Sequence, residues 1–170
     1  GKPQGIPFII ECLEACQGIE DAYFLIVGDG TEYGKLAEYV DTKKPKNVKL
    51  LKRLPKDEYD SMIAACDVGL IFLDHRFTIP NFPSRLLSYM QASIPVLAVT
   101  DVNTDIGDVI TDGNFGYWCE SRNVNMFNEL VKKLCDAEII TNMGINARKY
   151  LEENYTSKHS YEIIMKHLLK

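Results

Sequence analysis

The residues best placed to bind an anion lie where a helix is expected to begin. Pro83, Ser84 and Arg85 directly precede an apolar pattern with helical spacing. Proline suits the first turn of a helix, because its φ is fixed and its missing N–H would have no partner there. The amides of Ser84, Arg85 and Leu86 then lack an intrahelical acceptor, at the positive end of the helix dipole. We therefore expect a phosphate site, to which the Ser84 hydroxyl and the Arg85 guanidinium add donors. The alternative is an ordinary helix start with a solvated Arg85.

Two other loops that follow expected strands carry residues suited to a nucleotide. Gly28, Asp29 and Gly30 end one strand and precede a helix, which would let the backbone approach a ligand closely. They lack the third glycine of a dinucleotide fingerprint and the lysine of a P-loop, so a plain tight turn is the alternative. Arg53 and Leu54 follow the next strand, where the arginine is positioned for a base or a phosphate. An exposed arginine without a partner is equally compatible with the sequence.

Metal and nucleophile chemistry finds less support in the sequence. Cys12 and Cys16 share a helix face without further ligands, so we expect them in the core and no metal in the protein. Asp74 and Asp101 follow strands, but neither has a second acid beside it. His75 lies in the loop before the expected helix start, and we group it with the loops that face the ligand. No arrangement typical of a Ser/His/Asp or Cys/His centre is apparent.

The composition is that of one globular α/β domain. The chain has 170 residues, of which 46% are hydrophobic and 25% charged, and a formal net charge of −5. The acidic balance argues against a nucleic-acid partner, and no apolar run reaches the length of a membrane span. The five cysteines are odd in number and lie in apolar patterns, so we interpret them as reduced residues of a cytoplasmic protein.

Apolar strands and amphipathic helices alternate along the whole chain. Continuous apolar runs are typical of strands that are covered on both faces, and the alternation predicts a Rossmann-like, doubly wound parallel sheet with helices on both faces. In such sheets ligands bind beyond the carboxyl ends of the strands. The strands are expected at residues 22–28, 47–51, 67–73, 95–100 and 115–119, and the helices near 9–16, 33–40, 56–66, 84–92, 105–111, 127–134, 146–154 and 160–168.

The order of these motifs resembles the C-terminal domain of a group 1 glycosyltransferase with the GT-B fold. The matching stretches include FLIVGDGTEYGKLAEYV, NVKLLKRLPKDEYDSMIAACDVGLIFL, FPSRLLSYMQASIPVLAVTD and ARKYLEENYT, so nearly the whole chain is covered. Residues 1–5 resemble the loop that follows this domain's first strand. The resemblance therefore implies that residues 1–170 form a nucleotide-sugar-binding domain without its first strand and without the N-terminal acceptor domain.

The resemblance also implies a donor and a set of contacts. The donor is a nucleotide-sugar, with a UDP-sugar expected, and it is a substrate, so no cofactor is implied. The acceptor is a growing polysaccharide or a lipid-linked sugar, and the other half would supply any contact with the inner face of the membrane. Pro-Ser-Arg at the helix start is similar to enzymes of bacterial capsule, O-antigen and exopolysaccharide assembly. The residues that match donor contacts are Arg53, Leu54, Asn81, Ser84, Arg85, Leu86 and Ser88, with Lys2, Gln4, Gly28, Asp29, Gly30 and His75 in the neighbouring loops.

The sequence departs from the family pattern at three positions. Pro80 and Ser88 stand where many members have two glutamates, and Gln4 stands where a basic residue is common. A nucleotide-sugar 2-epimerase, which shares the fold and the donor, is an alternative, although it would need acidic and histidine residues around the sugar. A non-catalytic nucleotide-binding or receiver-like module is a third. The paired acids and the lysine of a receiver are absent from the sequence.

Overall fold

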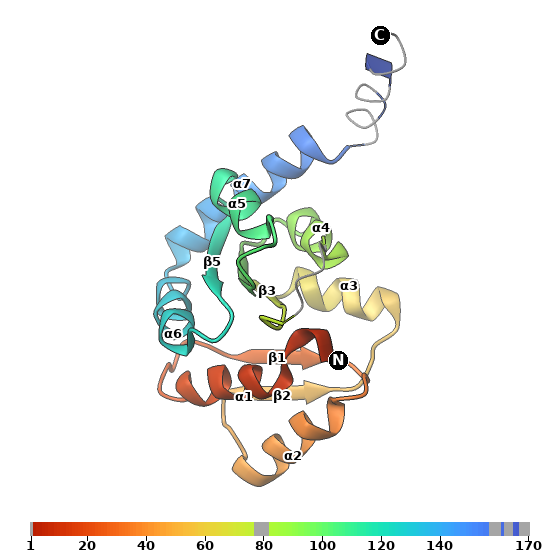
Figure 1. Ribbon diagram of the computed structural model, residues 1–170. Helices are drawn as coiled ribbons and strands as arrows, with labels where there is room; N and C mark the ends of the chain where they lie inside the picture. The colour runs from red at the N-terminus through yellow and green to blue at the C-terminus, as the bar shows by residue number, and fades with distance from the viewer. Residues whose placement is uncertain (1, 77–81, 157–160, 162–164, 167–170) are drawn as a thin grey trace.

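The computed structural model describes residues 2–76, 82–156, 161, 165 and 166, in which strands and helices alternate (Figure 1). The fold class predicted from the sequence is confirmed. A 3-10 helix, η1 (Lys2–Gln4), precedes α1 (Ile6–Ala15), β1 (Phe24–Val27), α2 (Tyr33–Lys43), β2 (Val48–Leu51), α3 (Lys56–Ala64), β3 (Gly69–Phe72), α4 (Ser84–Gln91), β4 (Val96–Thr100), α5 (Ile106–Asp112), β5 (Gly116–Glu120), α6 (Val124–Lys133) and α7 (Ala137–Asn154).

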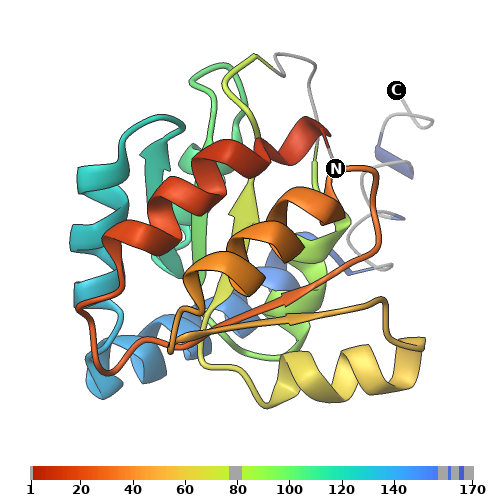
Figure 2. The same cartoon turned by 90° about the horizontal axis from the view of Figure 1, so that it is seen from below.

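The five strands all pair in parallel, but they are divided between two sheets. β1 pairs with β2, and β4 lies between β3 and β5. No pairing joins β1 to β3 within the described residues. Figure 2 shows that β1 and β2 run across the direction of β3 rather than alongside it. The doubly wound arrangement is therefore present without one continuous sheet.

The larger sheet has an apolar core on each face, as its continuous apolar strands predict. All five residues of β4 are buried. Leu97 and Val99 belong to the core that includes residues of α1 and α6, whereas Val96 and Ala98 belong to the core that includes residues of α4, α5 and α7. The carboxyl edge of this sheet is consequently a fixed platform for the loops that follow its strands.

The C-terminal part of the chain differs from its sequence-based prediction in one respect. Helix α7 has 18 residues, and the apolar spacing had predicted only its second half. The Asp136 side chain caps it, accepting hydrogen bonds from the amides of Glu138 (2.8 Å) and Ile139 (3.2 Å). The further helix expected near residues 160–168 falls largely outside the described residues. None of the helices in the described part of the chain is long and apolar enough to cross a bilayer.

Candidate functional site

Helix α4 begins where the sequence predicts and is anchored firmly. Pro83 is its N-cap rather than its first helical residue, with φ −64° and ψ 120°. The side chains of Leu86 and Met90 are fully buried beneath the helix. Just ahead of it, the Phe82 ring packs against Tyr155, with ring centroids 5.5 Å apart. The start of α4 is therefore held by the core below it and by the segment that follows α7.

The number of free amides at the start of α4 is smaller than the sequence predicts. The Leu86 amide donates to the Pro83 carbonyl at 2.9 Å, because the first turn is tightened by a bond to the third residue back. The expectation that Leu86 contributes a free donor is therefore wrong. The amides of Ser84 and Arg85 donate no backbone hydrogen bond to any described residue, and the Ser84 side chain is exposed. Two amides and one hydroxyl are thus available to an anion.

Arg85 is one of the residues that line a large, mainly apolar cavity. Its side chain is half-buried and forms no ion pair with any described residue. Burial raises the pKa of Tyr89, and the positive charge of nearby Arg85 acts in the opposite direction. The cavity has a volume of about 640 Å³, and Gln4 and Arg85 both line it. Of the predicted site residues, Gln4 from the N-terminal loop and Arg85 from the start of α4 therefore line the same cavity.

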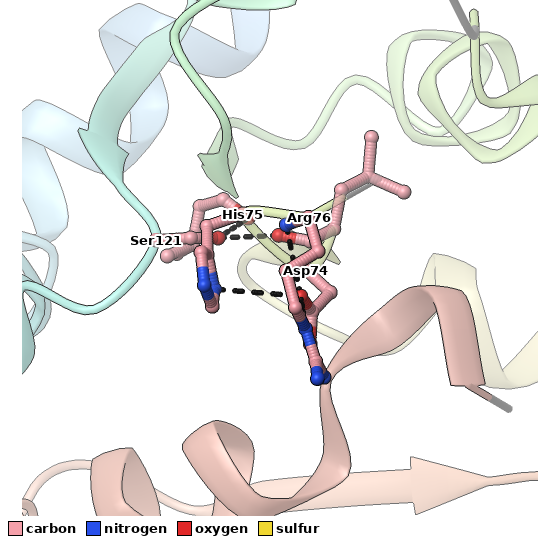
Figure 3. A network of polar contacts seen from close by, with 6 residues as sticks. Asp74, His75, Arg76 and Ser121 are labelled. Carbon is pink, nitrogen blue, oxygen red and sulfur yellow. Dashed lines mark hydrogen bonds and ion pairs between the residues drawn. The ribbon is translucent and has the colours of Figure 1, made fainter. Parts of the chain in front are cut away.

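A network of polar contacts lies directly after β3 (Figure 3). The Asp74 carboxylate, whose side chain is 9% exposed, accepts from the Arg76 amide at 2.9 Å and from its Nε and Nη2 at 2.8 Å each. These bonds hold the pKa of Asp74 at about 2. His75 Nδ1 lies 3.4 Å from the same carboxylate, and the Ser121 hydroxyl donates to the Leu73 carbonyl. The network fixes Asp74, His75 and Arg76, which follow β3 directly.

Asp74 also contacts the N-terminal loop, through its backbone amide. The Asp74 amide donates to the Pro3 carbonyl at 2.8 Å. Gly5 has a φ of +65°, and a Cβ there would lie 3.0 Å from Asp74 Oδ2. Glycine is therefore required at this position, both for the backbone conformation and for the close approach. Beside it lies a second cavity of about 560 Å³, whose lining includes Gly5, Lys35, Asp74 and Arg76.

The other predicted site residues are more dispersed. His75 joins the Asp74 network, but its ring is not among the residues lining either cavity. Ser84 and the half-buried Ser88 share a face of α4 outside the two cavities. Asn81 and the side chain of Lys2 lie outside the described residues. The loop Gly28, Asp29 and Gly30 before α2 lines neither cavity. The same holds for Arg53 and Leu54, which follow β2.

Sequence reasoning missed the part that Asp74 and Arg76 play. The sequence suggested only a metal-ligand role for Asp74. Among the described residues, however, no group of three side chains could hold a metal ion. A local signal was present, because an aspartate at the end of a strand often accepts from the amide two residues on. The contact with Gly5 could not be read locally, since it joins segments far apart in the sequence.

The fold defines an α/β domain with parallel strands, and a comparison with known families identifies it further. The profile of the family Glycosyl transferases group 1 matches residues 2–156. The chain belongs to this family.

Two curated relatives match nearly the whole chain. Pseudomonas aeruginosa "Probable glycosyltransferase WbjE" is 26% identical over 95% of this chain, and Methanocaldococcus jannaschii "Uncharacterized glycosyltransferase MJ1178" is 28% identical over 94%. The chain spans 40% and 41% of the length of these relatives. Among solved structures, the S. aureus TarM variant in complex with fondaparinux, α-GlcNAc-glycerol and UDP superposes with a TM-score of 0.79 at 20% identity. The match covers 96% of this chain and 32% of TarM. WaaG, a glycosyltransferase involved in lipopolysaccharide biosynthesis, gives 0.68 at 20% identity, over 94% of this chain and 41% of its own.

Proposed function

We propose that the chain is the domain of a glycosyltransferase that binds the nucleotide-sugar donor, and that the donor is UDP-linked. The observation that carries this proposal is the start of α4. There the amides of Ser84 and Arg85 lie at the positive end of the helix dipole, beside the Arg85 guanidinium, which forms no ion pair with any described residue. Membership of the family and the UDP bound in the TarM complex support the same assignment.

In the proposed reaction, the bond between the anomeric carbon and the diphosphate oxygen breaks while an acceptor oxygen bonds to that carbon and loses its proton. Negative charge then accumulates on the departing UDP. The two amides of α4 and Arg85 would stabilise this charge, and they are already oriented before the reaction. The acceptor, a polysaccharide or a lipid-linked sugar, would bind mainly to the other half of the protein.

The test is calorimetric titration of UDP and UMP into the chain and its variants. UDP should bind more tightly than UMP, because UMP lacks the second phosphate. Arg85→Ala should weaken UDP binding by about 1–3 kcal/mol, the range for a charge-assisted hydrogen bond at a half-buried site. Arg148→Ala is the matched control, since Arg148 bonds the carbonyl of Gln91 at the opposite end of α4 (3.3 Å).

Equal UDP affinity of the parent and Arg85→Ala would remove Arg85 from the site. A second assay addresses the reaction. The full-length protein, given a UDP-sugar and an acceptor, should release UDP and produce a glycosylated acceptor. Release of an epimerised sugar instead would favour the 2-epimerase alternative.

A further inference from the structure

The segment around β2 carries a concentration of positive charge that the rest of the chain lacks. Residues 43–56 include seven of the chain's 19 lysines and arginines and none of its 24 aspartates and glutamates. All seven of these cationic residues are exposed. Because the formal net charge of the whole chain is −5, the remainder of the chain is strongly acidic. The domain therefore has a local basic surface that its overall charge conceals.

Five of these cations form no ion pair with any described residue. The exceptions are Lys43, which lies 3.8 Å from Glu14, and Lys56, which lies 3.2 Å from Asp60. The unpaired five, which we call the basic edge, are Lys44, Lys46, Lys49, Lys52 and Arg53. Exposed like charges without partners repel one another, so the basic edge lowers the stability of the fold.

The basic edge follows the outer strand of the smaller sheet. β2 pairs with β1 and, within the part of the chain that the structure describes, with no other strand. Figure 1 shows β2 on the side of β1 away from β3. Val48 is buried in the core that includes residues of α1 and α2, so the side chain of Lys49 points away from that core. Two members of the basic edge precede the strand and two follow it. Because the four residues of β2 span about 13 Å, all five cations can act on one surface.

Protection of an edge strand explains only part of this charge. A lysine on an edge strand discourages pairing with another chain, and Lys49 serves this purpose. The other four members lie outside β2, where there is no strand edge to protect. Lys44 also has a φ of +47° at the end of α2, a conformation that favours glycine. Because four of the five charges have no role in protecting the strand and weaken the fold, we look for a partner that they attract.

The residues of the basic edge suit an extended anionic surface better than a small ligand. None of the five lines either cavity, so they do not converge on a concave site. Four of them are lysines, whose flexible point charges suit headgroups that move laterally, whereas planar bidentate recognition needs arginine. Residues 43–56 contain no aromatic side chain on which a nucleic-acid base could stack. The leucines of this segment are half-buried, so the contact is electrostatic and involves no insertion.

We propose that the basic edge docks the protein reversibly on the surface of a bilayer that contains anionic phospholipids. The contact lies on this domain, whereas the resemblance to glycosyltransferases implies a membrane contact only for the other half. Each lysine close to an anionic bilayer raises the partitioning of a protein onto it by about fivefold. The proposal does not depend on the donor site, and Arg53, which is among the predicted donor contacts, is left unchanged in the test.

The test measures sedimentation of the chain with vesicles in about 0.1 M salt, where the Debye length is about 10 Å. The vesicles contain phosphatidylglycerol and phosphatidylcholine in equal parts, or phosphatidylcholine alone. One variant combines Lys44→Gln, Lys46→Gln and Lys49→Gln. Its matched control removes the same charge from exposed lysines of α6 and α7, by Lys132→Gln, Lys133→Gln and Lys149→Gln.

The parent should sediment with the anionic vesicles and not with the neutral ones. The first variant should bind the anionic vesicles about tenfold or more weakly, and the control should stay within about threefold of the parent. Salt at about 0.5 M should release the parent, because the attraction between the two surfaces is screened.

Three results would overturn the proposal. The first is a parent chain that sediments no better with anionic vesicles than with neutral ones. The second is an equal loss of binding in the two triple variants, which would mean that only the net charge matters. The third is a parent chain that binds a DNA duplex in the same salt without binding the anionic vesicles, which would assign the basic edge to nucleic acid.

Discussion

Removing the charge of Asp74 should lower the unfolding free energy of the domain at neutral pH. In acid, the parent and the variant should differ much less in unfolding free energy. The carboxylate is 9% exposed and accepts three hydrogen bonds from Arg76. They lower the pKa of Asp74 from 3.8 to about 2. Because the folded value lies below the unfolded one, the unfolded chain binds the proton first as the pH falls. The stabilisation is therefore complete above about pH 4 and is lost as the pH falls toward 2.

The size of this effect follows from the same pKa difference. By linkage, a difference of that size corresponds to about 2 kcal/mol of unfolding free energy at pH 7. The Arg76 side chain is 75% exposed, so solvent screening reduces the expected value to about 1 kcal/mol. Asp74→Asn keeps an acceptor oxygen in place and removes only the charge, so its loss of stability should approach this value.

The measurement is urea unfolding of the parent and Asp74→Asn between pH 7 and pH 2.5, since urea does not screen charges. Asp112→Asn is the control, because Asp112 is exposed and has no ion pair among the described residues, and it should change the unfolding free energy by less than about 0.5 kcal/mol. A loss in Asp74→Asn that is the same at pH 7 and pH 2.5 would refute the reasoning, because it would owe nothing to the titration of this carboxyl.

Three further predictions concern α4 and its surroundings. Ser88→Glu should tighten UDP binding and widen the preference for UDP over its 2′-deoxy analogue. A carboxylate can accept two charge-assisted hydrogen bonds from the ribose diol, whereas a hydroxyl makes one neutral hydrogen bond. Calorimetry that finds the UDP affinity and this preference unchanged would contradict the prediction. Gly69→Ala should destabilise the domain by about 1–3 kcal/mol in urea unfolding, since its Cβ would lie 2.4 Å from the Tyr89 ring, and wild-type stability would mean that Tyr89 shifts freely. The 170-residue chain should release no UDP from a UDP-sugar with acceptor present, and measurable transfer would show that it contains the acceptor site as well.

Much of the fold follows from local patterns in the sequence. The apolar run at 95–100 predicts a strand covered on both faces, and β4 is one. The placement of α4 follows from Pro83 and from the spacing of Leu86 and Met90. The length of helix α7 was underestimated, although Met143, Ala147 and Leu151 repeat at four-residue spacing and are all buried.

The details of the site depend on contacts that no local pattern contains. Whether the first turn of α4 closes on Pro83, and so removes the Leu86 amide from the site, is decided by backbone geometry within one turn. The approach of Gly5 to Asp74 depends on how the N-terminal loop meets the end of β3. The division of the strands into two sheets depends on which edges have neighbours, whereas hydrophobic periodicity reports only which faces are covered.

The carboxyl edge of the larger sheet is rigid because its buried polar groups hold one another. The Ser121 amide donates to the Thr100 carbonyl at 2.7 Å, and its hydroxyl bridges to the end of β3. The Thr100 hydroxyl accepts from Trp118 Nε1 at 2.9 Å, and Asp101 accepts from the amide of Asn103 at 2.8 Å. Paired groups of this kind have one favourable arrangement, since breaking any bond leaves a buried polar atom unsatisfied. The ends of β3, β4 and β5 are therefore fixed relative to one another.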